Sequence, residues 1–372
     1  MKGVAVSRVR IALTAGFLAA AALRIGFLLL LSPNWDTEAY AAVVRTLDSG
    51  GTLYRDTARY NYSPAWALVL RVLARIAGEG GIPLERVVGS FLLLVDSISA
   101  FLLFRVARDV LARPPEAAAG AALLFFANPV SVFVTGFHAQ FDGVAIAFLL
   151  LAIWLEGRSR ARPAASAAAL AGSLLAKHVT ACHPIVFFRR RGEERRLTLP
   201  LVLLPYVVFV ASFLPYWKVR GAVLEKVLRY GSLAEDYGSA MLRQLPGMPH
   251  WAPSAIFFAA AIAAALWLRR VEPARASLLL FLVLLVFVPG IAEYYFVWPI
   301  ALGALFGGAG YAVFTLVVSA FFLGSPDGLA LPLTHLPGWH GIWFGTVFWL
   351  LWELRALGRH VPSRTLPPGG RG

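Results

Sequence analysis

Two acidic residues, Asp36 and Glu38, stand just beyond the first long apolar run of the chain, in the stretch 36-DTEAYAAVVRTL-47. Apolar residues recur there at helical spacing, which predicts an amphipathic helix on the outer leaflet of a membrane. A carboxylate at that boundary can act as a general base on a hydroxyl acceptor, and the D-x-E spacing also suits a divalent cation. The structural alternatives are a helix N-cap for Asp36 and a solvated surface charge for Glu38.

A second polar group interrupts the stretch 128-NPVSVFVTGFHAQFDGVAIAF-148, where His138, Gln140 and Asp142 separate two apolar runs. Ionisable side chains at membrane depth face a cavity or a partner far more often than lipid. These three residues are therefore candidates for substrate binding. The competing interpretation is that they cap helix ends at the interface.

Further charged residues complete the candidate set. Lys177 and His178 interrupt an Ala/Leu-rich segment, and an ammonium at headgroup level is costly unless it snorkels or meets an anion such as a phosphate. Arg59 could serve the same anion or only lipid headgroups. Glu293 lies in 289-PGIAEYYFVWPIAL-302, where an interfacial aromatic belt explains the Tyr and Trp residues but not the glutamate.

The composition predicts an integral membrane protein. Of 372 residues, 59% are hydrophobic and 15% charged, with a mean hydropathy of +0.71, whereas about a quarter of the residues in soluble domains are charged. The net charge of +14 would suggest nucleic acid for a soluble protein, but the basic residues form short clusters between apolar runs. That spacing is typical of the positive-inside rule, so no nucleic-acid partner is expected.

Several common chemistries lack a motif in this sequence. There is no P-loop, G-x-G-x-x-G, H-E-x-x-H or G-x-S-x-G pattern. The single cysteine, Cys182, excludes an internal disulfide and a cysteine-based metal cluster. A donor substrate is therefore expected to be lipid-borne or outside the cell.

The apolar runs predict an all-α polytopic bundle of about twelve membrane segments. They lie at about 11–31, 84–105, 116–133, 141–156, 163–177, 179–188, 198–217, 253–268, 275–291, 295–308, 309–324 and 340–354. With the N-terminus inside, every basic cluster falls on the cytoplasmic side, which predicts a multi-pass plasma-membrane protein with both termini cytoplasmic. Residues 1–360 then form one membrane domain with non-cytoplasmic loops over 32–83 and 218–252, and 361–372 form a disordered cytoplasmic tail.

Some segments depart from simple spans. The stretch 63–78 is short and basic, which predicts a second interfacial helix on the outer leaflet. The runs 163–177 and 179–188 predict two shortened helices that meet near Lys177. Arg24 and Asp96 both lie within spans and are expected to form an ion pair.

Five stretches, in order, resemble the GT-C superfamily of polytopic glycosyltransferases, which take sugars from polyprenyl-phosphate carriers on the non-cytoplasmic side. They are 36-DTEAYAAVVRTLDSGGTLY-54, 60-YNYSPAWALVL-70, 87-VVGSFLLLVDSISAFLLFRVARDVL-111, 127-ANPVSVFVTGFHAQFDGVAIAFLLLAIW-154 and 171-AGSLLAKHVTACHP-184. Within the superfamily the chain looks most like the mannosyltransferases that add the first mannose in GPI-anchor assembly and like bacterial polyprenol-dependent mannosyltransferases. The resemblance covers residues 30 to 190.

The resemblance implies an inverting transfer of a hexose, with mannose expected, from a polyprenyl-phosphate carrier to a lipid-linked or cell-envelope acceptor. Carried over by position, Asp36 would be the general base. Lys177 best fits the group beside the donor phosphate, with His138, His178 and Arg59 as further candidates.

The resemblance is incomplete at one motif. Many family members show D-x-D in the first outer loop, whereas this chain has Asn34-Trp35-Asp36. The first acid that a divalent cation would use is missing, so no cofactor is assigned.

Two other function classes remain open at this stage. A transporter or flippase of lipid-linked sugars would also need about twelve spans and buried charges, although it would often show inverted repeats. A non-catalytic membrane scaffold would leave the outer acidic residues unexplained.

Overall fold

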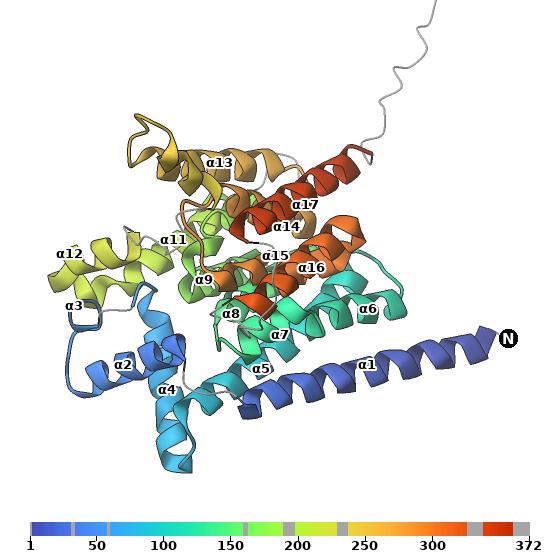
Figure 1. Ribbon diagram of the computed structural model, residues 1–372, viewed down its shortest axis with the longest axis horizontal. Coiled ribbons are helices and arrows are strands. Elements are labelled where there is room, and N and C mark those ends of the chain that lie inside the picture. The colour runs from blue at the N-terminus through green and yellow to red at the C-terminus, as the bar shows by residue number, and fades with distance from the viewer. Residues whose placement is uncertain are drawn as a thin grey trace, which may run out of the picture.

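The computed structural model describes residues 2–30, 34–57, 60–158, 163–188, 198–228, 237–325 and 338–359. In these ranges the chain forms helices and connecting loops without a β-strand, which confirms the all-α prediction. The longest helices are α1 (Lys2–Leu30), α5 (Leu84–Arg105) and α17 (Trp339–Arg359). In Figure 1, α1 runs along one edge of the molecule and α17 lies toward the other, with most of the apolar helices between them.

Most predicted apolar runs are helical close to their expected limits. They are α6 (Pro115–Phe126) with α7 (Pro129–Gly136), α8 (Asp142–Arg158), α9 (Pro163–Ala176), α11 (Leu199–Ser212), α13 (Ala252–Leu268), α14 (Pro273–Phe287), α15 (Trp298–Phe306) and α16 (Gly308–Gly324). The predicted segment 179–188 is wrong as a helical span, because it holds only the four-residue α10 (His183–Val186) after a 3-10 turn at His178–Thr180. Four residues rise only about 6 Å.

Two helical stretches, Arg8–Leu30 and Leu84–Val110, are long and apolar enough to cross a membrane. The number of such stretches rises to four if each of two bent helix pairs is counted as one span. The pairs are α6 with α7, bent by 49°, and α11 with the helical turns of 214–227, bent by 54°. Only 11% of the most apolar window of α1 is buried, which fits a helix facing lipid. Twelve crossings stay a prediction, because most other apolar helices are shorter than the roughly 20 residues that a bilayer core needs.

The segment that follows α1 folds into a layer of its own. It consists of α2 (Trp35–Asp48), α3 (Leu53–Asp56) and α4 (Pro64–Gly80), held by an aromatic cluster that includes Tyr54, Tyr60 and Trp66. The described parts of the second predicted outer loop form short turns: η3 (Leu214–Val219), α12 (Arg220–Val223), η4 (Leu224–Leu228) and η5 (Gly238–Gln244). Lys226 donates a hydrogen bond to the Thr57 carbonyl and so joins the two loops.

Both predicted amphipathic helices are present, but the apolar face of α2 differs from the expectation. Tyr40 and Val43 of α2 are buried against protein, with the Tyr40 ring 5.6 Å from that of Trp66. The apolar stripe of α2 therefore packs on α4 instead of lipid. On α4 one face is buried in the same cluster, while Leu68 and Val72 on another face remain exposed.

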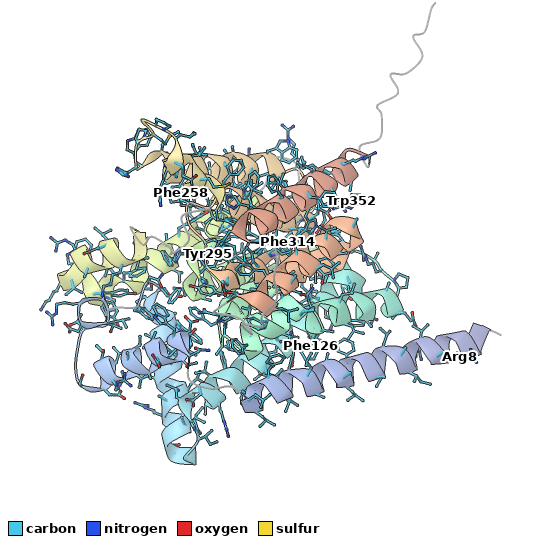
Figure 2. The ribbon with its side chains drawn as sticks, viewed as in Figure 1. Arg8, Phe126, Phe258, Tyr295, Phe314 and Trp352 are labelled. Carbon is cyan, nitrogen blue, oxygen red and sulfur yellow. The ribbon has the colours of Figure 1, made fainter. Side chains whose placement is uncertain are left out.

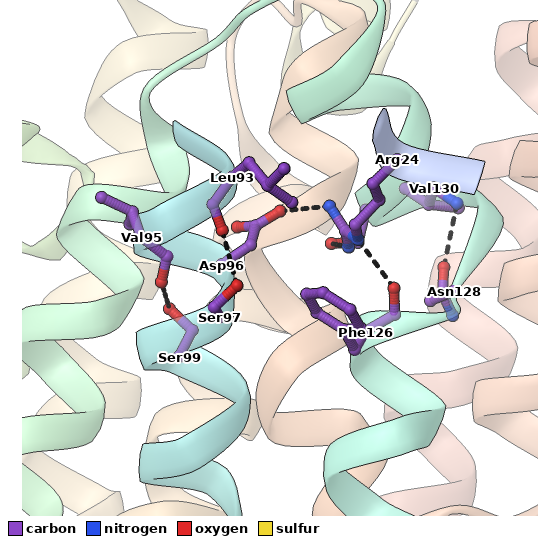
Figure 3. Close-up of polar contacts among 10 residues, drawn as sticks. Arg24, Leu93, Val95, Asp96, Ser97, Ser99, Phe126, Asn128 and Val130 are labelled. Atoms are coloured by element: carbon purple, nitrogen blue, oxygen red, sulfur yellow. Dashed lines mark hydrogen bonds and ion pairs between the residues drawn. The ribbon is translucent and has the colours of Figure 1, made fainter. Parts of the chain in front are cut away.

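The predicted ion pair between Arg24 and Asp96 is confirmed. The Arg24 guanidinium contacts the Asp96 carboxylate of α5, and both side chains are almost fully buried. It also donates to the Phe126 carbonyl and the Ser131 hydroxyl, each at 2.8 Å. Figure 3 shows this guanidinium at the break between α6 and α7. Arg24 thus satisfies a carbonyl at the helix end as well as a buried carboxylate.

Candidate functional site

A buried ion pair between Lys177 and Asp142 forms the centre of the candidate site. The Lys177 ammonium nitrogen lies 2.5 Å from Asp142 Oδ2, and the two side chains are 4% and 0% exposed. The indole Nε1 of Trp298 donates to the other carboxylate oxygen, also at 2.5 Å. Both oxygens of Asp142 are therefore engaged. The pairing satisfies the requirement that a buried charge meet a partner.

Four aromatic rings enclose the Lys177 ammonium. Its nitrogen lies 4.4 Å from the ring centroid of Tyr294 and 5.3 to 5.4 Å from those of Tyr295, Tyr62 and Phe141. These distances are within the range of cation–π attraction. Tyr295 and Trp298 stack on each other at 4.3 Å, and Figure 2 shows Tyr295 toward the middle of the molecule. Tyr294, Tyr295 and Trp298 thus face this site, which corrects their interpretation as an interfacial belt.

Lys177 and Asp142 are positioned by the ends of two helices. Lys177 follows the last residue of α9 and has an extended backbone with φ −153°, so its side chain leaves the helix axis. Asp142 is the first residue of α8, and the Ser173 hydroxyl of α9 donates to the Ala145 carbonyl of α8 at 2.7 Å. A Cβ at Gly143 would lie 3.0 Å from Asp96 Oδ1. The absent side chain there lets the start of α8 approach the Arg24–Asp96 pair.

The first turn of α2 is joined to the loop before α8. Asn34 is the N-cap residue, accepting from the amides of Asp36 and Thr37 at 3.1 and 3.0 Å, and Thr37 completes a capping box. The Asn34 amide also donates to the Phe137 carbonyl at 2.9 Å. The N-cap interpretation of Asp36 is therefore wrong, because Asn34 fills that position and Asp36 is the second residue of the helix.

The Asp36 carboxylate belongs to the same site. It is half-buried, and it interacts electrostatically with Tyr40, Tyr62 and the Lys177 ammonium. Burial above all, with smaller effects of nearby phenols and carboxylates, raises the pKa of Tyr62 well above its ordinary value, so this phenol stays neutral. Tyr40 bonds the Ala139 carbonyl at 3.3 Å, and Ala139 has a φ of +53°, a conformation uncommon for a residue with a side chain.

His138 and Glu293 lie at the edge of this site. His138 Nε2 is 3.7 Å from Glu293 Oε2, and the Ser325 hydroxyl donates to Glu293 Oε1 at 2.6 Å. Glu293 begins the 3-10 turn η6 (Glu293–Val297), directly before the Tyr294 ring that covers Lys177. The two residues therefore link the loop before α8 to the segment before α15.

Gln140 carries a buried amide in the same loop. Its side chain is 1% exposed, and within the described ranges neither its oxygen nor its nitrogen has a hydrogen-bond partner. The buried Nδ1 of His178 also lacks a hydrogen-bond partner there. Unpaired buried polar atoms cost free energy and are often found where a ligand binds.

The structure gathers most of the predicted site residues, but not all. Asp36, His138, Asp142, Lys177 and Glu293 come together from four segments of the chain, as the contacts above show, and Gln140 and His178 lie in two of those segments. Glu38 is exposed. Arg59 lies outside the described residues.

Sequence reasoning did not identify Tyr62, Phe141 and Trp298 as site residues. Their only signal was aromatic composition beside charged candidates. Within the described ranges, no group of three or more His, Cys, Asp or Glu residues is arranged to hold a metal ion.

The chain matches no family model, no curated protein and no solved structure.

Proposed function

We propose that this chain is an integral membrane glycosyltransferase that moves one hexose, most simply mannose, from a polyprenyl phosphate to a lipid-linked or cell-envelope acceptor. The observation that carries the proposal is the convergence of Asp36 with the aromatic-lined Lys177–Asp142 pair. A half-buried carboxylate beside a cation is what a transfer from a sugar phosphate to a hydroxyl requires. Membrane lipids and the two lipid-borne substrates would be the partners.

This reaction needs a negative group beside the acceptor hydroxyl and a positive group beside the phosphate that leaves. The Asp36 carboxylate would accept the proton of the acceptor hydroxyl as its oxygen attacks the anomeric carbon. The bond from that carbon to the phosphate oxygen breaks, and the electron pair leaves on the polyprenyl phosphate. Lys177 would offset the charge that develops on this phosphate, and attack opposite the leaving group inverts the anomeric configuration.

Asp142 would act by holding Lys177 in place. Its two oxygens already accept from the ammonium and the Trp298 indole, which leaves Asp36 as the carboxylate with access to an acceptor. The surrounding rings provide apolar faces on which a hexose can stack. Gln140 would donate and accept hydrogen bonds with sugar hydroxyls, which would satisfy its buried amide.

The proposal includes a GT-C-type bundle of about twelve segments, with the site on the non-cytoplasmic face and both termini in the cytoplasm. The arrangement of α14 supports this orientation. The helix starts three residues after Arg270 and ends shortly before Glu293, so a basic connector and the candidate site lie at opposite ends of it. Basic connectors face the cytoplasm in multi-pass membrane proteins.

The test is turnover of labelled polyprenyl-phosphate mannose by membranes that contain the protein. Asp36→Asn should lower turnover by about 10²- to 10⁴-fold, the usual contribution of a general base. Glu38→Gln is the matched control, because it removes the same charge from the same helical turn at an exposed position. Equal turnover of Asp36→Asn and wild type, at equal expression, would remove Asp36 as the base.

The role of Lys177 is tested by donor affinity. Lys177→Ala should raise the apparent KM for the donor, whereas an unchanged KM would remove its phosphate role. Lys177→Ala leaves Asp142 buried without its cation. The double variant Lys177→Met with Asp142→Leu is therefore also compared with the wild type, at matched thermal stability. That variant should fold and still bind the donor weakly.

A second candidate is translocation of a lipid-linked sugar, which the two bent helix pairs favour because broken helices are common in transporters. In proteoliposomes without acceptor, a translocator would move the labelled lipid between leaflets. The glycosyltransferase proposed here would leave it in place and consume it only when acceptor is added.

A further inference from the structure

An open cavity lined by apolar side chains and arginines lies where the far ends of several helices meet, away from the Lys177–Asp142 pair. It has a volume of about 610 Å³ and lies between the segment after α5, the connection from α13 to α14, the end of α15 and the end of α17. Its walls combine apolar side chains, including Leu111, Phe306 and Leu357, with the guanidinium groups of three arginines: Arg113, Arg270 and Arg275.

Only one of the three arginines is neutralised by direct contact. Arg275 lies 3.5 Å from the buried Glu353 carboxylate and stacks over the Phe306 ring at 4.6 Å. Within the described part of the chain, Arg113 and Arg270 make no ion pair. Burial, together with the like charge of Arg275, lowers the pKa of Arg113. An arginine still remains charged at physiological pH, so the cavity keeps unbalanced positive charge.

The acidic residue of the lining offsets only part of this charge, because Glu272 and Glu353 together balance two of the three arginines and leave one positive charge. The Glu272 carboxylate accepts from the amides of Ala274 and Arg275 at 2.8 and 3.0 Å, and so caps the first turn of α14. Its oxygens are directed at the helix, where they satisfy amides that otherwise lack partners. The free guanidinium groups are left to meet an anion from outside.

We propose that this cavity binds the phosphate group of an anionic phospholipid. Guanidinium groups form paired hydrogen bonds with phosphate oxygens, and the apolar walls suit the glycerol and first acyl carbons of a lipid. Basic pockets between membrane helices on the cytoplasmic side bind such headgroups in general. The cavity lies among the basic connectors that the charge pattern assigns to that side.

The lipid site is independent of the proposed transfer reaction. It lies at the start of α14, whereas the Lys177–Asp142 site adjoins the segment that follows its end, about 22 Å away by the rise of 15 helical residues. None of the cavity residues was assigned to donor or acceptor. Binding of an anionic lipid can therefore be measured whether or not the protein transfers sugar.

The experiment measures lipid affinity of the purified full chain in neutral detergent, by native mass spectrometry and by the rise in melting temperature. The probes are phosphatidylglycerol, phosphatidylcholine and inorganic phosphate. The variant is Arg113→Gln with Arg270→Gln, which spares the Arg275–Glu353 pair. The matched control is Arg108→Gln with Arg269→Gln, because these neighbours remove the same charge at the same end and do not line the cavity.

Phosphatidylglycerol should bind the wild type and the control alike, and the cavity variant about tenfold more weakly for each arginine removed. Arg113→Lys with Arg270→Lys should bind the lipid more tightly than the Gln variant and more weakly than the wild type, because lysine keeps the charge but not the paired hydrogen bonds. Equal loss in the cavity and control variants would overturn the proposal, since the effect would be general charge. Inorganic phosphate binding as tightly as the lipid would overturn the lipid as occupant.

Discussion

At the scale of single residues, two carboxylates in one site have different surroundings. Asp142 is fully buried and accepts from Lys177 and Trp298, so both its oxygens are occupied. Asp36 is half-buried at the first turn of α2, where the positive end of the helix dipole favours an anion. In the proposed reaction, this contrast makes Asp142 the residue that holds the cation and Asp36 the residue that would contact an acceptor.

The Arg24–Asp96 pair should behave as one unit in folding. Arg24→Met or Asp96→Leu alone should destabilise the protein by about 3–5 kcal/mol, because each leaves a buried charge without its partner. The double variant should cost clearly less than the sum of the two. Melting temperatures in detergent measure this, with Arg8→Met on the exposed face of α1 as the control. Additive losses would show that the two charges do not interact.

Gln140 should contribute to binding of the sugar donor without stabilising the substrate-free protein. Gln140→Leu removes a buried amide whose atoms are unpaired within the described ranges, so the substrate-free protein should melt at an equal or higher temperature. The apparent KM for the sugar donor should rise about tenfold, since one or two hydrogen bonds to the sugar are lost. Gln244→Leu, at an exposed position, should change neither quantity. A lower melting temperature with an unchanged KM would assign Gln140 a purely structural role.

Residue types and positions identified the ion pair of Arg24 with Asp96, because two opposite charges within apolar runs have few other partners. They did not reveal that Lys177 meets Asp142, since either residue could have met a substrate instead. The N-cap of α2 was misassigned for a local reason: Asn34 and Asp36 are both good capping residues two positions apart.

At the scale of elements, α2 positions Asp36 through its N-cap. Asn34→Ala should remove the capping box and the bond to Phe137, at about 1 kcal/mol of stability. Turnover should fall further than this small loss explains, because the first turn is no longer fixed to the loop before α8. Asn34→Asp keeps the acceptor for the helix amides but loses the donor to Phe137, so it should recover stability more than activity. Recovery of both to the same degree would contradict the positioning role.

The limits of most helices could be predicted from the apolar runs, because a long apolar run in lipid satisfies its backbone hydrogen bonds by forming a helix. The exception is 179–188, where the chain makes only α10 and its preceding turn. Tyr294, Tyr295 and Trp298 were also misread, because an inward-facing ring and a ring at the interface look alike in sequence.

At the scale of the whole molecule, the account requires the site and the arginine cavity to face opposite sides of the membrane. In a Cys182→Ser background, single cysteines at Glu38 and Glu79 should react with an impermeant maleimide in intact cells. Cysteines at Arg270 and Arg355 should react only after permeabilisation, because basic connectors are cytoplasmic. Labelling of all four positions from one side would contradict this topology.

Asp36 and Lys177 are proposed to act on one lipid-borne sugar phosphate. The most direct measurement is a structure of the Asp36→Asn variant, which should bind but not turn over, with polyprenyl-phosphate mannose. In that structure the phosphate should lie within about 4 Å of the Lys177 ammonium, and the anomeric carbon should lie between the phosphate and the side chain at position 36. A donor bound elsewhere, for example with its phosphate in the arginine cavity, would contradict it.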